Sequence, residues 1–441
     1  MTTPRLERSL SLRDLVITGI ILVQPTAPMP LFGVLNEKAR GHAVTTILIA
    51  MVAMLFTAIS YGRMARAYPS AGSAYTYVGQ EIHPALGYAT GWSMLMDYVI
   101  NPLICTIWCA KSALHIAPWI PYPLWAVFFA TLFTMMNLRR IQATARTNAI
   151  LAGGMGIVVV AVLVATVRHV LSMPALTAAY FLRPFYDPAT FSFPSLAAGT
   201  SLAVLTYIGF DGISTLSEEV RNPRRNVLLA MVLVCLIIGV LSAIEAYAAQ
   251  LVWPSTEHFP DPDTGYVYFA GRVGGVVLFQ VVNFTLLIAS IGSGAGGQLA
   301  GARLLYGMGR DRALPPGFFA HLDPKYHAPS YNVLLIGGLC LIGALSISYE
   351  FGAELLNFGA LIGFMGVNMA AFVRYFLRSE NKSISNFLPP LAGFVICLAI
   401  WLGLRNAAKL FGATWLLIGI AYGAWKTRGF RVPLRFEAAP E

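Results

Sequence analysis

Three carboxylic acids, Asp97, Asp211 and Glu245, lie in the middle of long apolar stretches of this sequence. An unpaired carboxylate is expensive to bury in such a stretch, and in membrane proteins it commonly marks a path for a substrate or an ion. No Lys or Arg lies at a comparable depth, since Lys111 falls near the end of its stretch. Acids without matching bases predict a site for a cationic ligand. The alternative is that each acid is protonated or hydrogen-bonded and ties helices together.

The stretch around Asp211 combines the acid with two glycines that weaken a helix. Gly209 and Gly212 flank Asp211 inside the apolar run 195–217, which is long enough to cross a bilayer at about 20 residues. Glycines this close together reduce helix continuity and let backbone carbonyls turn away from the helix ladder. We therefore predict a broken membrane helix with a charged group at the break. A continuous helix with Asp211 paired to a neighbouring helix is the alternative.

The composition places the whole chain in the membrane class. Hydrophobic residues make up 57% of the 441 positions and charged residues 11%, well below the roughly 25% that is usual in soluble domains. The five cysteines all fall in apolar segments, so we predict no disulfide framework, no metal site and no cofactor. The sequence contains no HExxH, GxSxG or Walker A motif, and we therefore do not expect an enzyme.

Twelve apolar segments follow one another along the chain and predict an all-α membrane protein with 12 transmembrane helices. With the N-terminus inside, most of the 30 Lys and Arg residues fall on the cytoplasmic side, which predicts a multi-pass protein of the cell (inner) membrane with both termini cytoplasmic. This topology explains the net charge of +10, which is no argument for nucleic acid. The segments are 14–35, 43–62, 85–113, 121–138, 148–168, 195–217, 226–252, 274–300, 331–349, 353–373, 387–404 and 410–426.

The first apolar segment repeats the interruption of the sixth. Pro25, Pro28 and Pro30 lie in its middle, where proline removes helix hydrogen bonds and clashes with the preceding turn. Broken helices 1 and 6 are the first members of the two five-helix halves in inverted-repeat transporters, whose site lies at the membrane midplane. The predicted parts are a cytoplasmic N-terminal segment 1–13, a ten-helix transport core 14–373 with repeats 14–168 and 195–373, helices 11 and 12 within 387–426, and a cytoplasmic tail 427–441.

Several motifs resemble signatures of the amino acid, polyamine and organocation transporter superfamily. They are Pro69–Tyr75 after the second segment, Gly209–Arg224 around the sixth and Arg303–Asp311 after the eighth. Within that superfamily, Leu55–Gly62, Gly91–Tyr98 and Ile208–Asp211 are most similar to bacterial putrescine importers. The resemblance implies the leucine-transporter fold, proton-driven uptake across the cytoplasmic membrane, and a site between helices 1, 3, 6, 8 and 10.

Two departures from the family pattern bear on the substrate. Putrescine importers carry an aspartate in the outer half of helix 1 where this chain has Pro30, so one diamine contact is absent. Amino-acid members usually bind the substrate carboxylate with the free amides of a glycine-rich break. Here Gln24–Pro28 replaces those glycines, and proline offers no N–H. We expect a small organic cation, putrescine or a related polyamine, with an amino acid as the alternative substrate and a non-transporting nutrient sensor as a further alternative.

The resemblance and the predicted breaks together give a set of candidate site residues. The predicted substrate-binding residues are Gln24, Pro25, Thr26, Ala27, Asp97, Tyr98, Asn101, Tyr207, Ile208, Gly209, Phe210, Asp211 and Asn357. We expect Asp97 to hold one ammonium group of a diamine and Asp211 or nearby carbonyls to hold the other. The candidates for a cytoplasmic gate are Glu218, Glu219, Arg221 and Arg224.

Protons are the expected coupling ion, and the candidate carriers are Asp211, Asp97 and Glu245. A bound ammonium favours an ionised carboxylate, whereas a drier cavity favours the protonated one, so substrate and proton would bias one acid in opposite directions. The rival ion is sodium, held by break carbonyls with hydroxyls of Ser290 or Ser293. The acids of the loop 257–263 are expected to face water.

Overall fold

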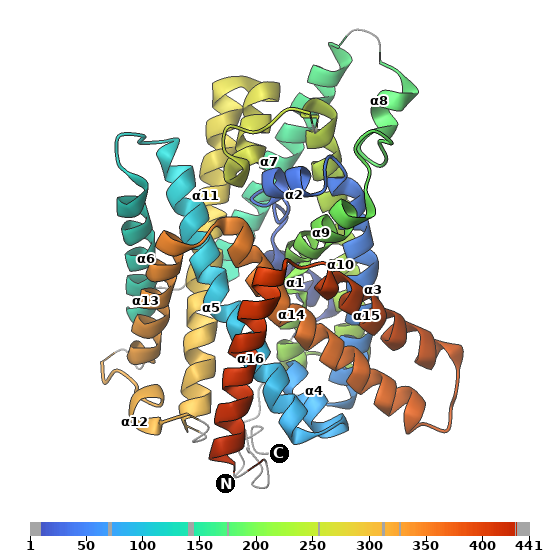
Figure 1. The fold of residues 1–441 in the computed structure, drawn as a ribbon, viewed down its shortest axis with the longest axis vertical. Helices are drawn as coiled ribbons and strands as arrows, with labels where there is room; N and C mark the ends of the chain where they lie inside the picture. The colour runs from blue at the N-terminus through green and yellow to red at the C-terminus, as the bar shows by residue number, and fades with distance from the viewer. Residues whose placement is uncertain are drawn as a thin grey trace.

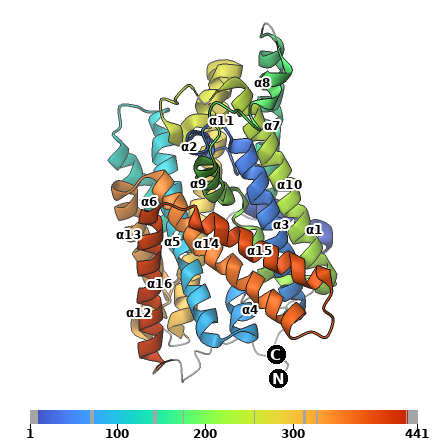
Figure 2. The ribbon, with the colours of Figure 1, turned by 45° about the vertical axis from the view of Figure 1, so that its right-hand side comes forward.

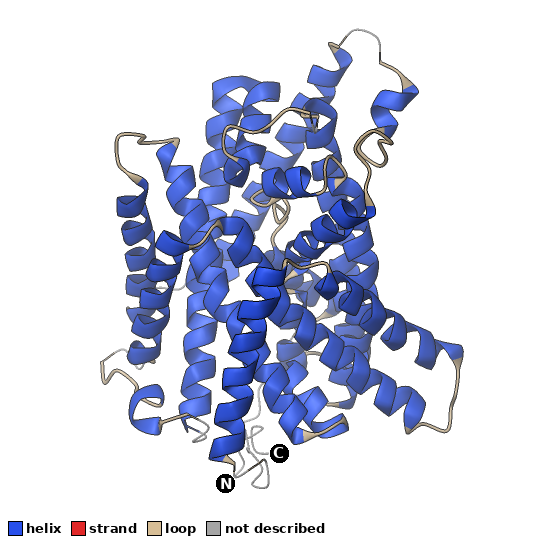
Figure 3. Ribbon diagram, viewed as in Figure 1, coloured by secondary structure: helices blue, strands red, loops and turns tan. Residues whose placement is uncertain are grey.

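A computed structural model shows a protein built almost entirely of helices (Figures 1 and 3). The structure describes residues 10–68, 73–139, 145–173, 176–254, 256–310, 314–325, 328–427 and 429. Within these ranges the backbone forms no strand, and a single isolated bridge joins Leu10 to Val220. The prediction of an all-α protein is therefore confirmed.

Nine stretches of the described chain are helical, long enough and apolar enough to cross a membrane. They lie within α3 (Ala43–Ala67), α5 (Pro84–Leu114), α7 (Ala145–Leu171), α9 (Phe193–Ala203) with the turns after it, α10 (Pro223–Val252), α11 (Gly265–Arg310), α14 (Tyr349–Phe372) with a π-helical end at Val373–Leu377, α15 (Ile384–Leu402) and α16 (Asn406–Lys426). Two shorter apolar helices, α6 (Tyr122–Leu138) and α13 (Ser330–Ser346), occupy the fourth and ninth predicted segments. The total of twelve crossings stays a prediction.

The first predicted segment is divided into α1 (Leu12–Val23) and α2 (Phe32–Lys38). Ser11 caps α1 by accepting a hydrogen bond from the Asp14 backbone, which satisfies one of the free amides of the first turn. At the other end Gln24 has a φ of 75°, and Pro25 cannot supply the next helical N–H. The interruption predicted from the prolines is therefore present, and short turns carry the chain across it to α2.

The sixth predicted segment is also interrupted, but its second half differs from a regular α-helix. α9 passes into a 3₁₀ turn at Val204–Tyr207, and after Gly209 the chain forms a 3₁₀ helix, η2, over Phe210–Glu219. Gly209 has a φ of 112°, a backbone angle that residues other than glycine rarely adopt. A Cβ at Gly209 would lie 3.2 Å from the carbonyl oxygen of Leu22 in α1. The two interruptions therefore lie against each other.

The long helices form one bundle in which α5 lies centrally and packs on α11 and α14, while α3 packs along α10 (Figures 1 and 2). Short helices mark the two ends of this bundle. We call the end that holds α2 and α8 (Ala178–Leu182) the α2 face, and the end that holds α4 (Ser73–Glu81) and α12 (Pro316–Phe319) the α4 face.

α11 is longer than the apolar segment that predicted it. Its start, Gly265–Gly274, is separated from the rest by a kink at Gly275, whose φ of 68° suits glycine. The predicted segment 274–300 therefore begins at the kink. Beyond residue 300 the helix continues to Arg310 at the α4 face, where a Cβ at Gly309 would meet the backbone of Phe319 in α12.

Candidate functional site

A cavity of about 660 Å³ lies where the two interruptions meet α5, α7 and α11. This volume falls in the range of roughly 300–1,000 Å³ that is typical of small-molecule sites. Nine of the predicted substrate-binding residues lie on its wall: Gln24, Pro25, Ala27, Asp97, Tyr98, Asn101, Ile208, Gly209 and Asp211. The Gln24 side chain also donates a hydrogen bond to the Ala289 carbonyl of α11, 3.2 Å away, which ties the first interruption to the opposite wall.

Asp97 and Asp211 are close enough on this wall for their charges to interact. Backbone groups at the break, those of Gly209, Asp211 and Gly212, lie close to the Asp211 carboxylate. No Lys or Arg within the described residues forms an ion pair with either acid. Both acids therefore line the cavity without an ion-pair partner among the described residues.

Tyr207 and Asn357, two predicted binding residues, use their polar groups to hold helices together. The Tyr207 hydroxyl donates to the Ile47 carbonyl of α3 at 2.8 Å, and the Asn357 amide donates to the Ser201 carbonyl of α9 at 2.8 Å. Both side chains are buried, and neither lies on the cavity wall. These two hydrogen bonds hold the sixth segment against α3 and α14.

Thr26 and Phe210, two further predicted residues, also lie off the cavity wall. The Thr26 hydroxyl turns toward the sulfur of Met155 at 3.9 Å. Phe210 packs against Tyr61 and Phe364 in a buried aromatic cluster beside the break, with ring centroids 5.8 and 5.4 Å apart. The structure therefore brings Asp211 to the cavity and turns its neighbour Phe210 away from it.

The cavity wall also contains residues that sequence reasoning missed. Arg303 of α11 is exposed and lies on the wall near the α4 face, so the expectation of a cavity without bases needs correction. Gly297 is a second case, because a Cβ there would lie 2.5 Å from the Asn101 side-chain oxygen. The signal for this close approach was the glycine-rich stretch around it. Ser290 and Ser293 of the same stretch, named from the sequence as ligands for the rival sodium ion, line the wall as well.

Comparison with known proteins places this bundle and cavity in a family. The family model for amino acid permeases matches residues 31–422, which is most of the chain. The chain belongs to the amino acid permease family. It is therefore an integral membrane protein of the amino acid, polyamine and organocation superfamily, as the motifs implied.

Three curated relatives of this permease span nearly its whole length. The low-affinity putrescine importer PlaP of Escherichia coli strain K12 is 32% identical over 97% of this chain and 96% of its own. The branched-chain amino acid permease BcaP of Lactococcus lactis is 27% identical over 95% of this chain and 94% of its own. The methylthioribose transporter of Bacillus subtilis is 25% identical over 95% of this chain and 92% of its own. The family and these relatives are transporters.

At the α2 face of the permease, buried ion pairs join segments that are far apart in sequence. Glu354 of α14 is fully buried, and its two oxygens accept hydrogen bonds from Lys38 of α2 at 2.8 Å and from Arg405, before α16, at 2.6 Å. Lys38 also contacts Glu350 at 2.5 Å. Glu354, unlike Asp97 and Asp211, is therefore neutralised by bases of the protein. These ion pairs hold α2 against α14.

From the sequence, we expected the acids of the loop 257–263 to face water. In the structure they form ion pairs with bases. Lys111 of α5 pairs with Asp261 at 3.0 Å and with the largely buried Asp263 at 2.6 Å. Glu257 pairs with Arg272, and this hydrogen bond lowers the pKa of the Glu257 carboxyl. The expectation holds for Glu257, which is exposed, and was wrong for Asp263, which is buried beside Lys111 at the end of α5.

The predicted gate residues at the α4 face show no gate in the described structure. The Arg221 backbone amide bonds to the Leu10 carbonyl at 2.8 Å, while the side chains of Arg221 and Arg224 are exposed. The side chains of Glu218 and Glu219 lie outside the described part of the chain. Whether these four residues form a gate therefore stays a prediction.

A buried acid on α4 forms the ion pairs that the structure describes at this face. Glu81 accepts hydrogen bonds from Arg374, from Arg378 at 3.1 Å and from the Tyr68 hydroxyl at 2.7 Å. Burial and this hydrogen bond raise the pKa of Tyr68, which keeps its hydroxyl protonated as a donor. The cluster ties α4 to the ends of α3 and α14.

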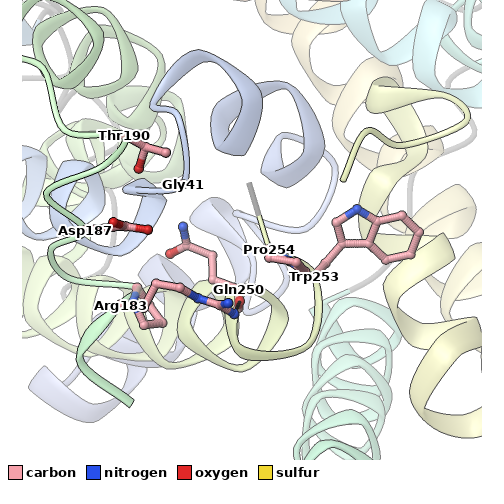
Figure 4. Close-up of a pocket in the computed structure, with 8 residues that line it drawn as sticks. Gly41, Arg183, Asp187, Thr190, Gln250, Trp253 and Pro254 are labelled. Carbon is pink, nitrogen blue, oxygen red and sulfur yellow. Dashed lines mark hydrogen bonds between the residues drawn. The ribbon is translucent and has the colours of Figure 1, made fainter. Parts of the chain in front are cut away.

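A second, much smaller pocket lies at the α2 face (Figure 4). Arg183 and Asp187, from the region of α8, lie beside Gln250 of α10. Gln250 is already engaged, because it donates to the Asn36 side chain at 2.9 Å and accepts from the Val44 amide at 3.1 Å. With about 10 Å³ of space the pocket has room for a water molecule and not for a substrate.

Proposed function

We propose that this permease is a secondary active importer of a small organic cation, putrescine or a related polyamine, that works by alternating access and is coupled to protons. In this proposal it spans the cell (inner) membrane twelve times with both termini cytoplasmic. Residues 14–373 form a leucine-transporter-like 5+5 inverted repeat, with repeats 14–168 and 195–373, followed by helices 11 and 12 within 387–426.

The observation that carries the proposal is the pair of carboxylic acids, Asp97 and Asp211, on one cavity wall, neither of which forms an ion pair with a base in the described part of the chain. Two like charges in one partly dry cavity repel each other, and a bound cation removes that repulsion. A diamine supplies two ammonium groups, one for each acid. The relative named as a putrescine importer, 32% identical, supports this choice of substrate class.

The first interruption supports a cation over a zwitterion. Pro25, Ala27 and Gln24 line the cavity at the break, and proline has no N–H for a substrate carboxylate. The amino-acid alternative also has a specific observation in its favour. Arg303 lies on the same wall and offers a charge that a carboxylate could bind, and a relative is named as a branched-chain amino acid permease.

Alternating access is supported by the difference between the two ends of the cavity. Toward the α2 face the wall is formed by the buried Trp108 and Tyr349, whereas toward the α4 face it includes the exposed Arg303. A Cβ at Gly33 in α2 would lie 2.2 Å from the Pro262 carbonyl oxygen. α2 is therefore packed tightly against the loop that precedes α11. We take this as the inward-facing form, with the α2 face outside.

The test is uptake of labelled putrescine into proteoliposomes, with and without an inward proton gradient and in the absence of sodium. We expect the gradient to stimulate accumulation and unlabelled putrescine to compete far better than ornithine, which adds a carboxylate to the diamine. Equal competition by ornithine would favour the amino-acid alternative. Collapse of uptake without sodium would show that protons are not the coupling ion, and binding without uptake would indicate a sensor.

A further inference from the structure

Of the three acids proposed for proton coupling, Glu245 is the one that lies outside the substrate cavity. Its side chain, on α10, is fully buried, and neither carboxylate oxygen has a hydrogen-bond partner within the described residues. No charged side chain acts on it electrostatically in that part of the chain. An ionised carboxylate is strongly disfavoured in such a place, because neither water nor a counter-charge stabilises it. Glu245 is therefore held as a neutral carboxylic acid in this conformation.

Two other buried polar groups, one on α10 and one on α11, also lack hydrogen-bond partners within the described residues. The Ser242 hydroxyl lies one turn earlier on α10, on the same side of the helix, and is buried and unpaired. The Tyr266 hydroxyl of α11 is likewise buried and unpaired, and Tyr266 is the titratable group that interacts electrostatically with Glu245. Buried polar groups without a partner are uncommon in folded proteins, and each calls for an explanation.

α2 covers this group from the α2 face. Phe32 packs edge-on against the Tyr266 ring, with centroids 5.7 Å apart at 89°. Asn36 bonds Gln250, which lies beyond Glu245 on α10, at 2.9 Å. If α2 moved away to open the cavity at this face, Tyr266 would lose this contact and water would gain a path to the acid. Closure of α2 expels that water again, so it requires Glu245 to be protonated first.

We infer that Glu245, with Ser242 and Tyr266, forms a proton-binding site separate from the substrate cavity, and that α2 closes over it after it takes up a proton. This inference rests on the proposed proton-coupled transport and assigns the coupling proton to Glu245, which leaves Asp97 and Asp211 to bind the cation. Proton uptake and substrate binding then occur in two places and meet in the movement of α2.

The transport test uses full-length protein in proteoliposomes with labelled putrescine. Glu245→Gln imitates the protonated acid permanently, so stimulation by an inward proton gradient should be lost, while putrescine exchange at equal pH should continue within about threefold of wild type. Glu380→Gln, which neutralises an exposed acid, is the matched control and should keep the stimulation. Full stimulation in Glu245→Gln would overturn the inference.

A second measurement is independent of transport and of the substrate. Infrared spectra of the purified protein above neutral pH should show the C=O stretch of a carboxylic acid that disappears in Glu245→Gln. The absence of such a band in wild type would overturn the inference even if putrescine transport is proton-driven. Its presence would support the site even if putrescine proves not to be the substrate.

If Glu245→Gln does not fold, the variant Tyr266→Phe tests the same inference. This change removes one hydroxyl and leaves the ring that packs on Phe32. The C=O band of Glu245 should shift because it loses a neighbouring hydroxyl, and gradient stimulation should fall while exchange continues. An unshifted band together with unchanged stimulation would contradict the proposed site.

Discussion

The acid in the ion-pair cluster around Glu354 and the acids in the cavity around Asp211 have opposite surroundings. Glu354 is fully buried, and both of its oxygens are paired with bases, Lys38 and Arg405. Asp211 and Asp97 face open space, and in the described structure neither is paired with a base. An acid that is paired with bases joins two segments of the protein, whereas an unpaired acid on a cavity wall is available to bind a cationic ligand. This difference, more than burial itself, separates structural acids from candidate binding residues.

The largest expected effect comes from removing the charge at the break. Asp211→Asn keeps the shape of the side chain but deletes the charge that the ammonium contacts, so we expect loss of putrescine binding and of gradient-driven accumulation. Scintillation proximity binding and proteoliposome uptake measure the two. Accumulation that survives intact in Asp211→Asn would show that the cavity acids do not bind the substrate.

A smaller effect is expected from the backbone that places Asp211. Gly209→Ala puts a Cβ on a residue with a φ of 112°, close to the Leu22 carbonyl. A left-handed conformation costs a residue with a side chain about 1–2 kcal/mol, which corresponds to roughly tenfold weaker putrescine binding if the break must distort. Gly153→Ala on α7 is the control, since a Cβ there meets no atom within 4 Å. Equal affinity in both variants would mean that the break tolerates a side chain.

The smallest effect on binding is expected at the paired acid. Glu354→Gln leaves Lys38 and Arg405 without their buried partner, so we expect a loss of about 1–3 kcal/mol in the free energy of unfolding. Putrescine affinity of the folded protein should change by less than about threefold. Glu350→Gln is the control, because Glu350 is partly exposed and should destabilise the protein less. Thermal unfolding and calorimetric binding separate the two effects, and a large loss of affinity with little loss of stability would remove the distinction drawn here.

The helices and interruptions were predictable because they depend on local sequence. The apolar run 226–252 became α10 at Pro223–Val252, and the prolines at 25, 28 and 30 ended α1 as expected. The break in the sixth segment pointed to Asp211, whereas the expectation that Asp97 shares its site came from the family resemblance, and both acids line one cavity. These predictions needed the composition of single stretches and the resemblance of three motifs.

The partners of buried groups were not predictable from one sequence. Glu354 pairs with Lys38 across more than 300 positions, and nothing local to either residue indicates the other. Asn357 is a polar residue in an apolar helix, which is equally expected of a binding residue and of the helix-tying contact that it makes with Ser201. Arg303 reached the cavity wall because α11 extends beyond its apolar segment.

The most direct test of the account compares a diamine with a monoamine at Asp97. Calorimetry would measure binding of putrescine and of butylamine, which has the same chain and one ammonium group, to wild type and to Asp97→Asn. Loss of one charge-assisted contact, worth about 1.5–3 kcal/mol, should weaken putrescine binding by roughly 10- to 100-fold and leave butylamine binding within about threefold. An equal loss for both amines, or no loss for either, would contradict the claim that two cavity carboxylates hold the two ends of a diamine.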